Sequence, residues 1–144
     1  MVSAEIPDQG NDKELFNSVV KHMIHGPCGQ LNHKSLCMVE NRCSKGFPKA
    51  FEKETITGED GYPLYRRRDP DNGGQKVTIG KGKQETVVDN SWVVPYSPLL
   101  IKTFDCHINV EFCNSIKSIK YVTKYVNKGT DACAFSIEHV LFSI

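Results

Sequence analysis

Residues 55–74 read TITGEDGYPLYRRRDPDNGG, and this stretch decides the fold class of the chain. Its two β-type runs, Thr55–Thr57 and Tyr62–Arg68, flank a turn at Glu59–Gly61. A second strong turn follows at Asp69–Gly74, where proline, aspartate, asparagine and glycine occur together. Short strands separated by tight turns predict an antiparallel sheet, a β-meander, in the middle of the protein.

The strand pattern continues toward the C-terminus. Further strands are expected at 77–79 and 85–89, around a glycine turn at 80–82. The segment 106–111 alternates, so Ile108 and Val110 would share one face of a strand. The segment 99–104 fits either a short helix or an extended segment.

Helical patterns lie on both sides of these strands. Residues 12–24 predict a first helix, capped by Asn11 or Asp12, and Gly26–Pro27 would stop it. Residues 115–128 have apolar positions at helical spacing, including Val126, and predict a C-terminal helix. The chain is therefore expected to be an α+β protein.

Length and composition describe one ordinary globular domain. The chain has 144 residues, of which 39% are hydrophobic and 24% are charged, and these values are typical of one folded domain. No apolar stretch is long enough to span a membrane, and residues 1–10 do not resemble a secretory signal. An intracellular location without membrane association is expected.

The arginine run Arg66–Arg68 has two interpretations. The formal net charge of +1 gives no support for nucleic-acid binding, but these arginines could form part of a local basic face that contacts DNA phosphates. Alternatively, they belong to an alternating strand and are solvated, with acidic partners nearby.

One histidine and three cysteines form a candidate metal site in residues 25–48. The spacing His25-x2-Cys28-x8-Cys37-x5-Cys43 supplies one imidazole and three thiolates, which is a suitable set for tetrahedral zinc. His33 is a possible substitute ligand, and unliganded cysteines in a polar loop are the alternative. The three other cysteines are expected to be isolated small apolar residues: Cys106, Cys113 and Cys133.

Two tyrosines in the C-terminal helix have a chemically interesting spacing. Tyr121 and Tyr125 are four residues apart, which places both phenols on one helix face. A tyrosine oxygen can attack a phosphodiester and hold the cut strand as a phosphotyrosyl ester. The alternative is that both tyrosines border the buried stripe of an amphipathic surface helix.

The chain resembles, over nearly its whole length, the Helitron helicase-like family, the replication-initiator part of eukaryotic rolling-circle transposases. Its tyrosine segment is also similar to that of rolling-circle initiators from small DNA phages. The family resemblance rests on six blocks in the same order: Ser3–Asp8, His22–Gly29, Cys43–Lys49, Asp60–Arg68, Trp92–Tyr96 and His107–Glu111.

The resemblance implies a partial HUH-endonuclease-like domain that nicks and transfers single-stranded DNA. It implies that Tyr121 and Tyr125 are the nucleophiles and that the complete enzyme uses a divalent cation such as Mg²⁺ or Mn²⁺. Lys124 and Lys128 would stabilise phosphate charge during the reaction. Arg66–Arg68 and Lys128 are the expected DNA contacts, and a nuclear location goes with this assignment.

The chain departs from the family pattern in two places. It contains no His-x-His to hold the divalent cation, although His107 and Glu111 could share a strand face near such a site. It also lacks the phosphate-binding loop of the helicase domain that full-length members carry. We therefore expect a truncated fragment, 1–144, that is inactive alone or nearly so.

Two alternatives to the nuclease fragment stay open. The first is a zinc-stabilised DNA-binding module, in which Trp92 or Tyr96 stacks on a base. The second is a degenerate transposon remnant without catalysis. The oligomeric state is not predicted.

Overall fold

The computed structural model describes residues 1–59, 61–80, 82, 85–112, 123 and 126. The chain divides into two compact units, each treated by itself below. Unit 1 comprises Met1–Thr57 and Pro63–Phe112, and unit 2 comprises Gly58–Tyr62 and Cys113–Ile144. In unit 2 the turn at Gly58 is closed by a hydrogen bond from the Gly58 N–H to the Tyr62 carbonyl, at 2.8 Å.

Only two residues of the predicted tyrosine helix belong to the described part of the chain. Thr123 and Val126 are both helical and both exposed. Val126, which the apolar pattern assigns to a buried stripe, is 65% exposed. Tyr121, Lys124, Tyr125 and Lys128 lie outside the described residues, as do Cys113 and Cys133.

The first helix, α1, spans Lys13–His22 and confirms the prediction closely. Of the two predicted caps, Asp12 is the one used, and its side chain accepts a hydrogen bond from the Leu15 N–H. The helix ends before Gly26–Pro27, because Ile24 already pairs with Val93 in an antiparallel β-bridge. Tertiary pairing, rather than the glycine and proline, stops this helix.

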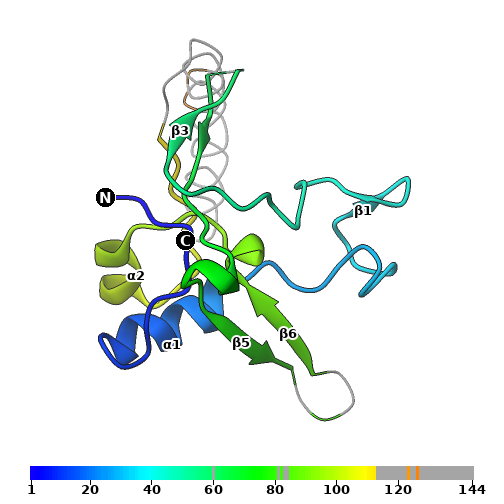
Figure 1. Cartoon of the computed structure of the whole chain (residues 1–144). Coiled ribbons are helices and arrows are strands. Elements are labelled where there is room, and N and C mark those ends of the chain that lie inside the picture. The colour runs from blue at the N-terminus through cyan, green and yellow to red at the C-terminus, as the bar shows by residue number, and fades with distance from the viewer. Residues whose placement is uncertain (60, 81, 83–84, 113–122, 124–125, 127–144) are drawn as a thin grey trace, which may run out of the picture. The chain divides into compact units, whose positions relative to one another are not determined.

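The described strands form three separate antiparallel pairs. The prediction of a single β-meander was therefore wrong. Met38–Val39 (β1) pairs with Arg42–Cys43 (β2), and Ile56–Thr57 (β3) pairs with Pro63–Leu64 (β4). Lys76–Ile79 (β5) pairs with Thr86–Asp89 (β6) over four residues, as predicted. The helices and small antiparallel sheets confirm the general α+β class (Figure 1).

The predicted strand at 62–68 shrinks to Pro63–Leu64 for a physical reason. Beyond Leu64 the Arg66 N–H donates to the side-chain Oγ1 of Thr55 at 3.0 Å instead of to a ladder carbonyl, and the chain then makes an isolated bridge between Arg67 and Glu52. The Arg67 side chain is directed into the protein interior. The short helix η1, Pro70–Asn72, then completes the predicted turn after Asp69.

The segment 99–104 is helical, which resolves the open alternative. The helix α2 spans Pro98–Phe104, with Ser97 as its N-cap residue. Residues 106–111 do not form a strand, although Val110 donates a backbone hydrogen bond to Pro95 at 3.0 Å. The alternation is nevertheless as predicted, because Ile108 and Val110 are partly buried between exposed neighbours.

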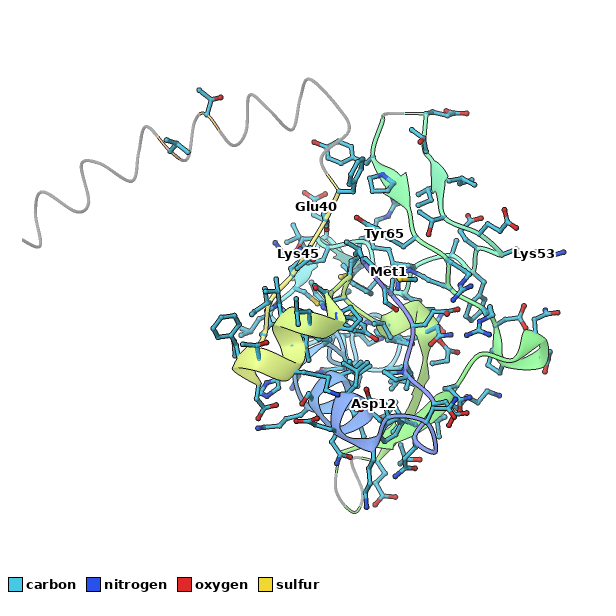
Figure 2. All side chains as sticks on the ribbon, turned by 90° about the vertical axis from the view of Figure 1, so that its left-hand side faces the viewer. Met1, Asp12, Glu40, Lys45, Lys53 and Tyr65 are labelled. Atoms are coloured by element: carbon cyan, nitrogen blue, oxygen red, sulfur yellow. The ribbon has the colours of Figure 1, made fainter. Side chains whose placement is uncertain are left out.

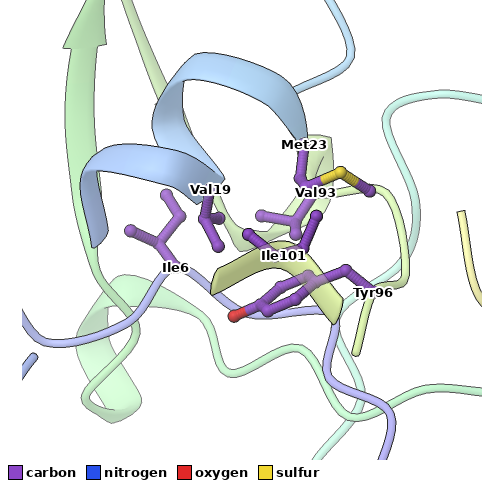
Figure 3. Packing of buried hydrophobic residues seen from close by; sticks show 6 residues of the cluster. All are labelled: Ile6, Val19, Met23, Val93, Tyr96 and Ile101. Atoms are coloured by element: carbon purple, nitrogen blue, oxygen red, sulfur yellow. The ribbon is translucent and has the colours of Figure 1, made fainter. Parts of the chain in front are cut away.

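The main core joins α1, α2 and the apolar stretch that precedes α2 (Figure 3). Its buried members are Ile6, Val19, Met23, Val93, Tyr96 and Ile101. The Tyr96 hydroxyl donates to the Glu5 carbonyl at 2.9 Å, so the phenol is anchored as well as buried. Burial raises the pKa of Tyr96 to about 12.

Tyr96 and Trp92 are both core residues, so the prediction that one of them stacks on a nucleic-acid base was wrong. Trp92 belongs to η3, Asn90–Trp92, and forms a second cluster with Cys28 and Val88. Partly buried residues of the loop 25–48 pack on this cluster, including Cys37, Cys43 and Phe47. The loop is therefore attached to the β5–β6 hairpin through Trp92 and its neighbours.

Candidate metal centre

The four residues predicted as metal ligands meet in the structure. The ligand atoms of His25, Cys28, Cys37 and Cys43 all lie within 4.8 Å of one another. Cys28 is buried and the other three are partly buried. We call residues 25–48 the metal loop; in Figure 1 it extends to one side of the α1 and α2 helices. His33, the possible substitute ligand, is exposed and does not belong to this group.

A tight hairpin brings Cys37 and Cys43 together. Its two loop residues, Glu40 and Asn41, have φ angles of 49° and 63°, the left-handed pair that a type I′ turn requires. The Cys37 carbonyl accepts from the Ser44 N–H at 2.8 Å, which extends the β1–β2 pairing past Cys43. The sequence analysis missed this hairpin. The signal was Asn41, which tolerates φ > 0, between two two-residue β-type runs.

His25 is positioned from the core side. Its backbone N–H donates to the Trp92 carbonyl at 2.8 Å, continuing the bridge between Ile24 and Val93. Its ring stacks on Phe47, with centroids 4.3 Å apart and an interplanar angle of 13°. Trp92 lies nearly parallel to the same ring at 6.4 Å. Backbone pairing and stacking together hold the imidazole with Nε2 facing Cys43.

Cys28 and Cys43 have opposite electrostatic environments. Burial, followed by the neighbouring Cys37 and Cys43 side chains, raises the pKa of Cys28 to about 12. Burial also acts to raise the pKa of Cys43, but backbone N–H groups of Phe47 and Lys45 outweigh it and lower the pKa. These donors are suited to stabilise a thiolate at Cys43. The pKa of His25 is lowered by burial and by the positive charges of Lys49 and Lys45, which favours the neutral, ligating imidazole.

The spacing of the cluster suits a small tetrahedral ion. Tetrahedral zinc has Zn–S and Zn–N distances of about 2.3 and 2.0 Å, which place sulfur and nitrogen ligands ~3.5 Å apart. The observed distance from Cys43 Sγ to His25 Nε2 is 3.5 Å. Three thiols and one imidazole so arranged could hold a metal ion such as zinc.

The side chains of Arg66, Arg67 and Arg68 contact the N-terminal segment and do not form a continuous basic surface. Glu5, whose side chain is 8% exposed, accepts from Arg66 Nη2 at 2.9 Å and from Arg68 Nε at 2.9 Å. The Arg68 backbone N–H donates to the same carboxylate at 2.9 Å. Arg66 and Arg68 are therefore partly exposed and paired with an acid, which agrees with the alternative interpretation of the run.

Arg67 is placed quite differently from its neighbours. It is 4% exposed, and its Nη1 donates to the carbonyls of Ala4, Asn90 and Val93 at 3.0, 3.0 and 2.7 Å. Burial lowers the pKa of Arg67 to about 10, so the guanidinium stays charged at neutral pH. A side chain held this way is not on the protein surface, and the structure gives no support to Arg67 as a DNA contact.

His107 and Glu111 do not form a metal site within the described part of the chain. His107 Nδ1 lies 2.7 Å from the carbonyl of His22, near the end of α1. The cluster of His25, Cys28, Cys37 and Cys43 is the metal-type group found among the residues that the structure describes. Cys106 is a free, exposed cysteine outside this cluster, which agrees with the expectation that it is isolated.

Comparison with protein-family models and with curated proteins finds no match to this chain. Among the residues described, no helix has the length and apolar character needed to cross a membrane. The assignment of function therefore rests on the sequence blocks and on the geometry of the metal loop.

Proposed function

We propose that this chain is a region of a Helitron-type initiator nuclease, a rolling-circle enzyme that nicks and transfers single-stranded DNA. In this proposal Tyr121 and Tyr125 are the nucleophiles, and unit 1 is a scaffold stabilised by zinc. The partial HUH-endonuclease-like fold and the nuclear location belong to the same proposal. The observation that carries it is the ordered set of sequence blocks, together with the contacts that these blocks make.

Blocks far apart in the sequence contact one another in unit 1. Glu5, from Ser3–Asp8, pairs with Arg66 and Arg68. His25 and Cys28 meet Cys43, which opens the block Cys43–Lys49. The block Trp92–Tyr96 contains four buried residues: Trp92, Val93, Pro95 and Tyr96. Residues that contact one another in the folded protein are expected to occur together in a family. These contacts between the blocks support the proposed resemblance.

We infer that the ion of the metal loop is zinc and that its role is structural. Three thiolates and an imidazole favour zinc over Mg²⁺ or Ca²⁺, which prefer oxygen ligands. His25, Cys28, Cys37 and Cys43 would supply all four ligands of a tetrahedral ion, which would leave no open position for a substrate or water. Such a closed site stabilises the fold and does not itself carry out chemistry.

The chemistry proposed for the tyrosines is a transesterification. A tyrosine oxygen attacks phosphorus, gives up its proton, and releases the hydroxyl of the next nucleotide as it forms a phosphotyrosyl ester. The second tyrosine can repeat the step on another strand. Lys124 and Lys128 would offset the negative charge that develops on the phosphate.

Activity also needs a divalent cation bound near the tyrosines, which in this family polarises the scissile phosphate. The sequence contains no His-x-His to hold it. We therefore propose that another polypeptide segment supplies that histidine pair, and that these 144 residues have little or no nicking activity without it.

Covalent trapping tests the nuclease proposal. The chain is prepared as it stands and extended by the reading frame upstream of Met1, and each form is incubated with Mn²⁺ and a labelled single-stranded oligonucleotide. We expect the extended form to give a protein–DNA adduct that survives denaturing electrophoresis. The adduct should be lost in Tyr121→Phe plus Tyr125→Phe and kept in Tyr62→Phe. An extended protein that carries a His-x-His and forms no adduct would overturn the proposal.

Metal analysis tests the zinc assignment separately. Protein purified without chelator should contain about one equivalent of zinc. Cys43→Ser should lower this content strongly. Cys106→Ser, which changes an exposed cysteine outside the cluster, should not. Zinc content far below one equivalent in the unchanged protein would reject the site.

A second candidate function is a zinc-stabilised DNA-binding module without catalysis. The observation that favours it is the metal centre itself, because a site of three cysteines and one histidine is suited to stabilise a fold rather than to carry out chemistry. Salt-sensitive binding of an oligonucleotide, with no adduct in either form of the protein, would favour this second function.

A further inference from the structure

Positive charge is concentrated around the metal loop. Between His25 and Ala50 the chain has four cationic residues, Lys34, Arg42, Lys45 and Lys49, and a single acidic residue, Glu40. This segment therefore has a formal charge of +3, whereas the whole chain has +1, so the remaining residues sum to −2. Three metal-bound thiolates and one Zn²⁺ would together add −1, which leaves the segment positive.

These four cations are exposed and have no acidic partner in the part of the chain that the structure describes. In contrast, Lys21, Arg66, Arg68 and Lys102 each pair with a carboxylate. An ion pair neutralises the local charge of a surface. The segment 25–50, whose cations are not paired, therefore attracts an anion more strongly than the paired residues do.

Lys45 and Lys49 lie beside the metal site itself. Both lower the pKa of His25 by their charge. The Lys49 ammonium lies 5.2 Å from the centroid of the Phe47 ring, on which His25 stacks. Figure 2 shows Lys45 and the single acid Glu40 labelled on this loop. The backbone that bears Lys45 also donates to Cys43, so a metal ion would fix the position of this cation.

We propose that Lys34, Arg42, Lys45 and Lys49 form a basic surface that binds the phosphate backbone of single-stranded DNA. This inference rests on the proposed function for the identity of its ligand. The exposed apolar side chains Leu31, Leu36 and Val39 lie on the same loop and offer contacts to unstacked bases. The metal centre thus holds a DNA-binding surface in place.

Fluorescence anisotropy of a labelled 20-nucleotide oligo-dT measures this binding over a range of salt concentrations. Each phosphate contact contributes about −0.7 to the slope of log K against log salt for a single strand. Four contacts predict a slope of about −2.8. Lys45→Gln plus Lys49→Gln should reduce it to about −1.4 and weaken binding about 25-fold at 0.1 M salt.

Lys13→Gln plus Lys76→Gln is the matched control, because it removes the same charge from two exposed lysines of α1 and β5. This control should retain the slope and nearly all of the affinity. An equal loss in both double variants, or no loss in either, would overturn the assignment of the surface. Zinc content identical to that of the unchanged protein verifies that the metal loop is intact in each variant.

The outcomes separate this inference from the proposed function. If the adduct with Tyr121 and Tyr125 forms while the lysine variants bind normally, the basic surface is refuted and the nuclease proposal stands. Absence of oligo-dT binding at low salt also refutes the surface, whatever the adduct assay shows. Binding of oligo-U that is markedly tighter than binding of oligo-dT would refute DNA as the ligand.

Discussion

Replacing Arg67 by methionine should destabilise the protein severely, although Arg67 lies in a run that looks like a DNA contact. The guanidinium is buried and donates to three backbone carbonyls, from Ala4, Asn90 and Val93. Methionine retains most of the aliphatic length but can donate no hydrogen bond. The change therefore isolates the hydrogen bonds from the packing.

The magnitude follows from the carbonyls that lose a partner. Asn90 O also accepts from the Val93 N–H at 3.3 Å, whereas the other two carbonyls are given no second donor by the described residues. A buried polar group left without a partner costs about 1–3 kcal/mol. Two such groups predict a loss of roughly 4 kcal/mol in the free energy of unfolding.

Urea denaturation checks this value. With an m-value of about 2 kcal/mol per molar, 4 kcal/mol moves the unfolding midpoint down by about 2 M. Arg66→Met is the matched control, because its side chain is half exposed and makes an ion pair with Glu5, and it should cost about 1 kcal/mol or less. Equal effects of the two substitutions, or a shift below 0.5 M (~1 kcal/mol at that m-value) for Arg67→Met, would refute the structural role of Arg67.

Three further predictions concern Glu5, the metal loop and Tyr96. Burial acts to raise the pKa of Glu5, but Arg68 and Arg66 outweigh it and hold the folded-state pKa below the ordinary value of 4.5. The stabilisation from Glu5 is therefore present above pH 4.5 and is lost as pH falls through the folded-state pKa, and Glu5→Gln should flatten this part of a stability–pH curve. Chelation of the metal should change the fluorescence of Trp92, the single tryptophan, because the centroid of its ring lies 6.4 Å from that of His25. Chelation should also lower the free energy of unfolding by roughly 4 kcal/mol if the ion is present at about 1,000 times its Kd. Unchanged fluorescence and melting temperature after complete metal removal would contradict a structural ion. Tyr96→Phe should lower the free energy of unfolding by about 1–2 kcal/mol, because the core loses the hydrogen bond from the hydroxyl to the Glu5 carbonyl. An unchanged melting temperature would show that this hydrogen bond does not stabilise the fold.

The metal centre was predictable because its four ligands occur within nineteen residues, and their chemistry restricts what they can do together. The hairpin that closes the site was missed, since β1 and β2 have only two residues each and give no readable periodicity. Glu40 and Asn41 take positive φ angles in the two-residue connection between β1 and β2. This turn brings Cys37 and Cys43 together.

Trp92 and Tyr96 illustrate a second reason for failure. Aromatic residues serve equally well in a core or as a stacking platform, and local sequence does not distinguish the two uses. The burial of Tyr96 depends on α1 and on Ile6, and the burial of Trp92 depends on Cys28 and other residues of the metal loop. These partners lie far away in the sequence.

Local patterns were sufficient for what depends on near neighbours along the chain. The Asp12 cap with α1, the β5–β6 hairpin, the turn after Asp69 and the metal ligand set all follow from spacing and turn chemistry. The tertiary structure alone decided the roles of three consecutive arginines. Arg66 and Arg68 pair with Glu5, while Arg67 binds carbonyls that are 23 to 63 residues away. Identical side chains acquire different roles because burial and available partners are properties of the folded chain, and no local pattern contains them.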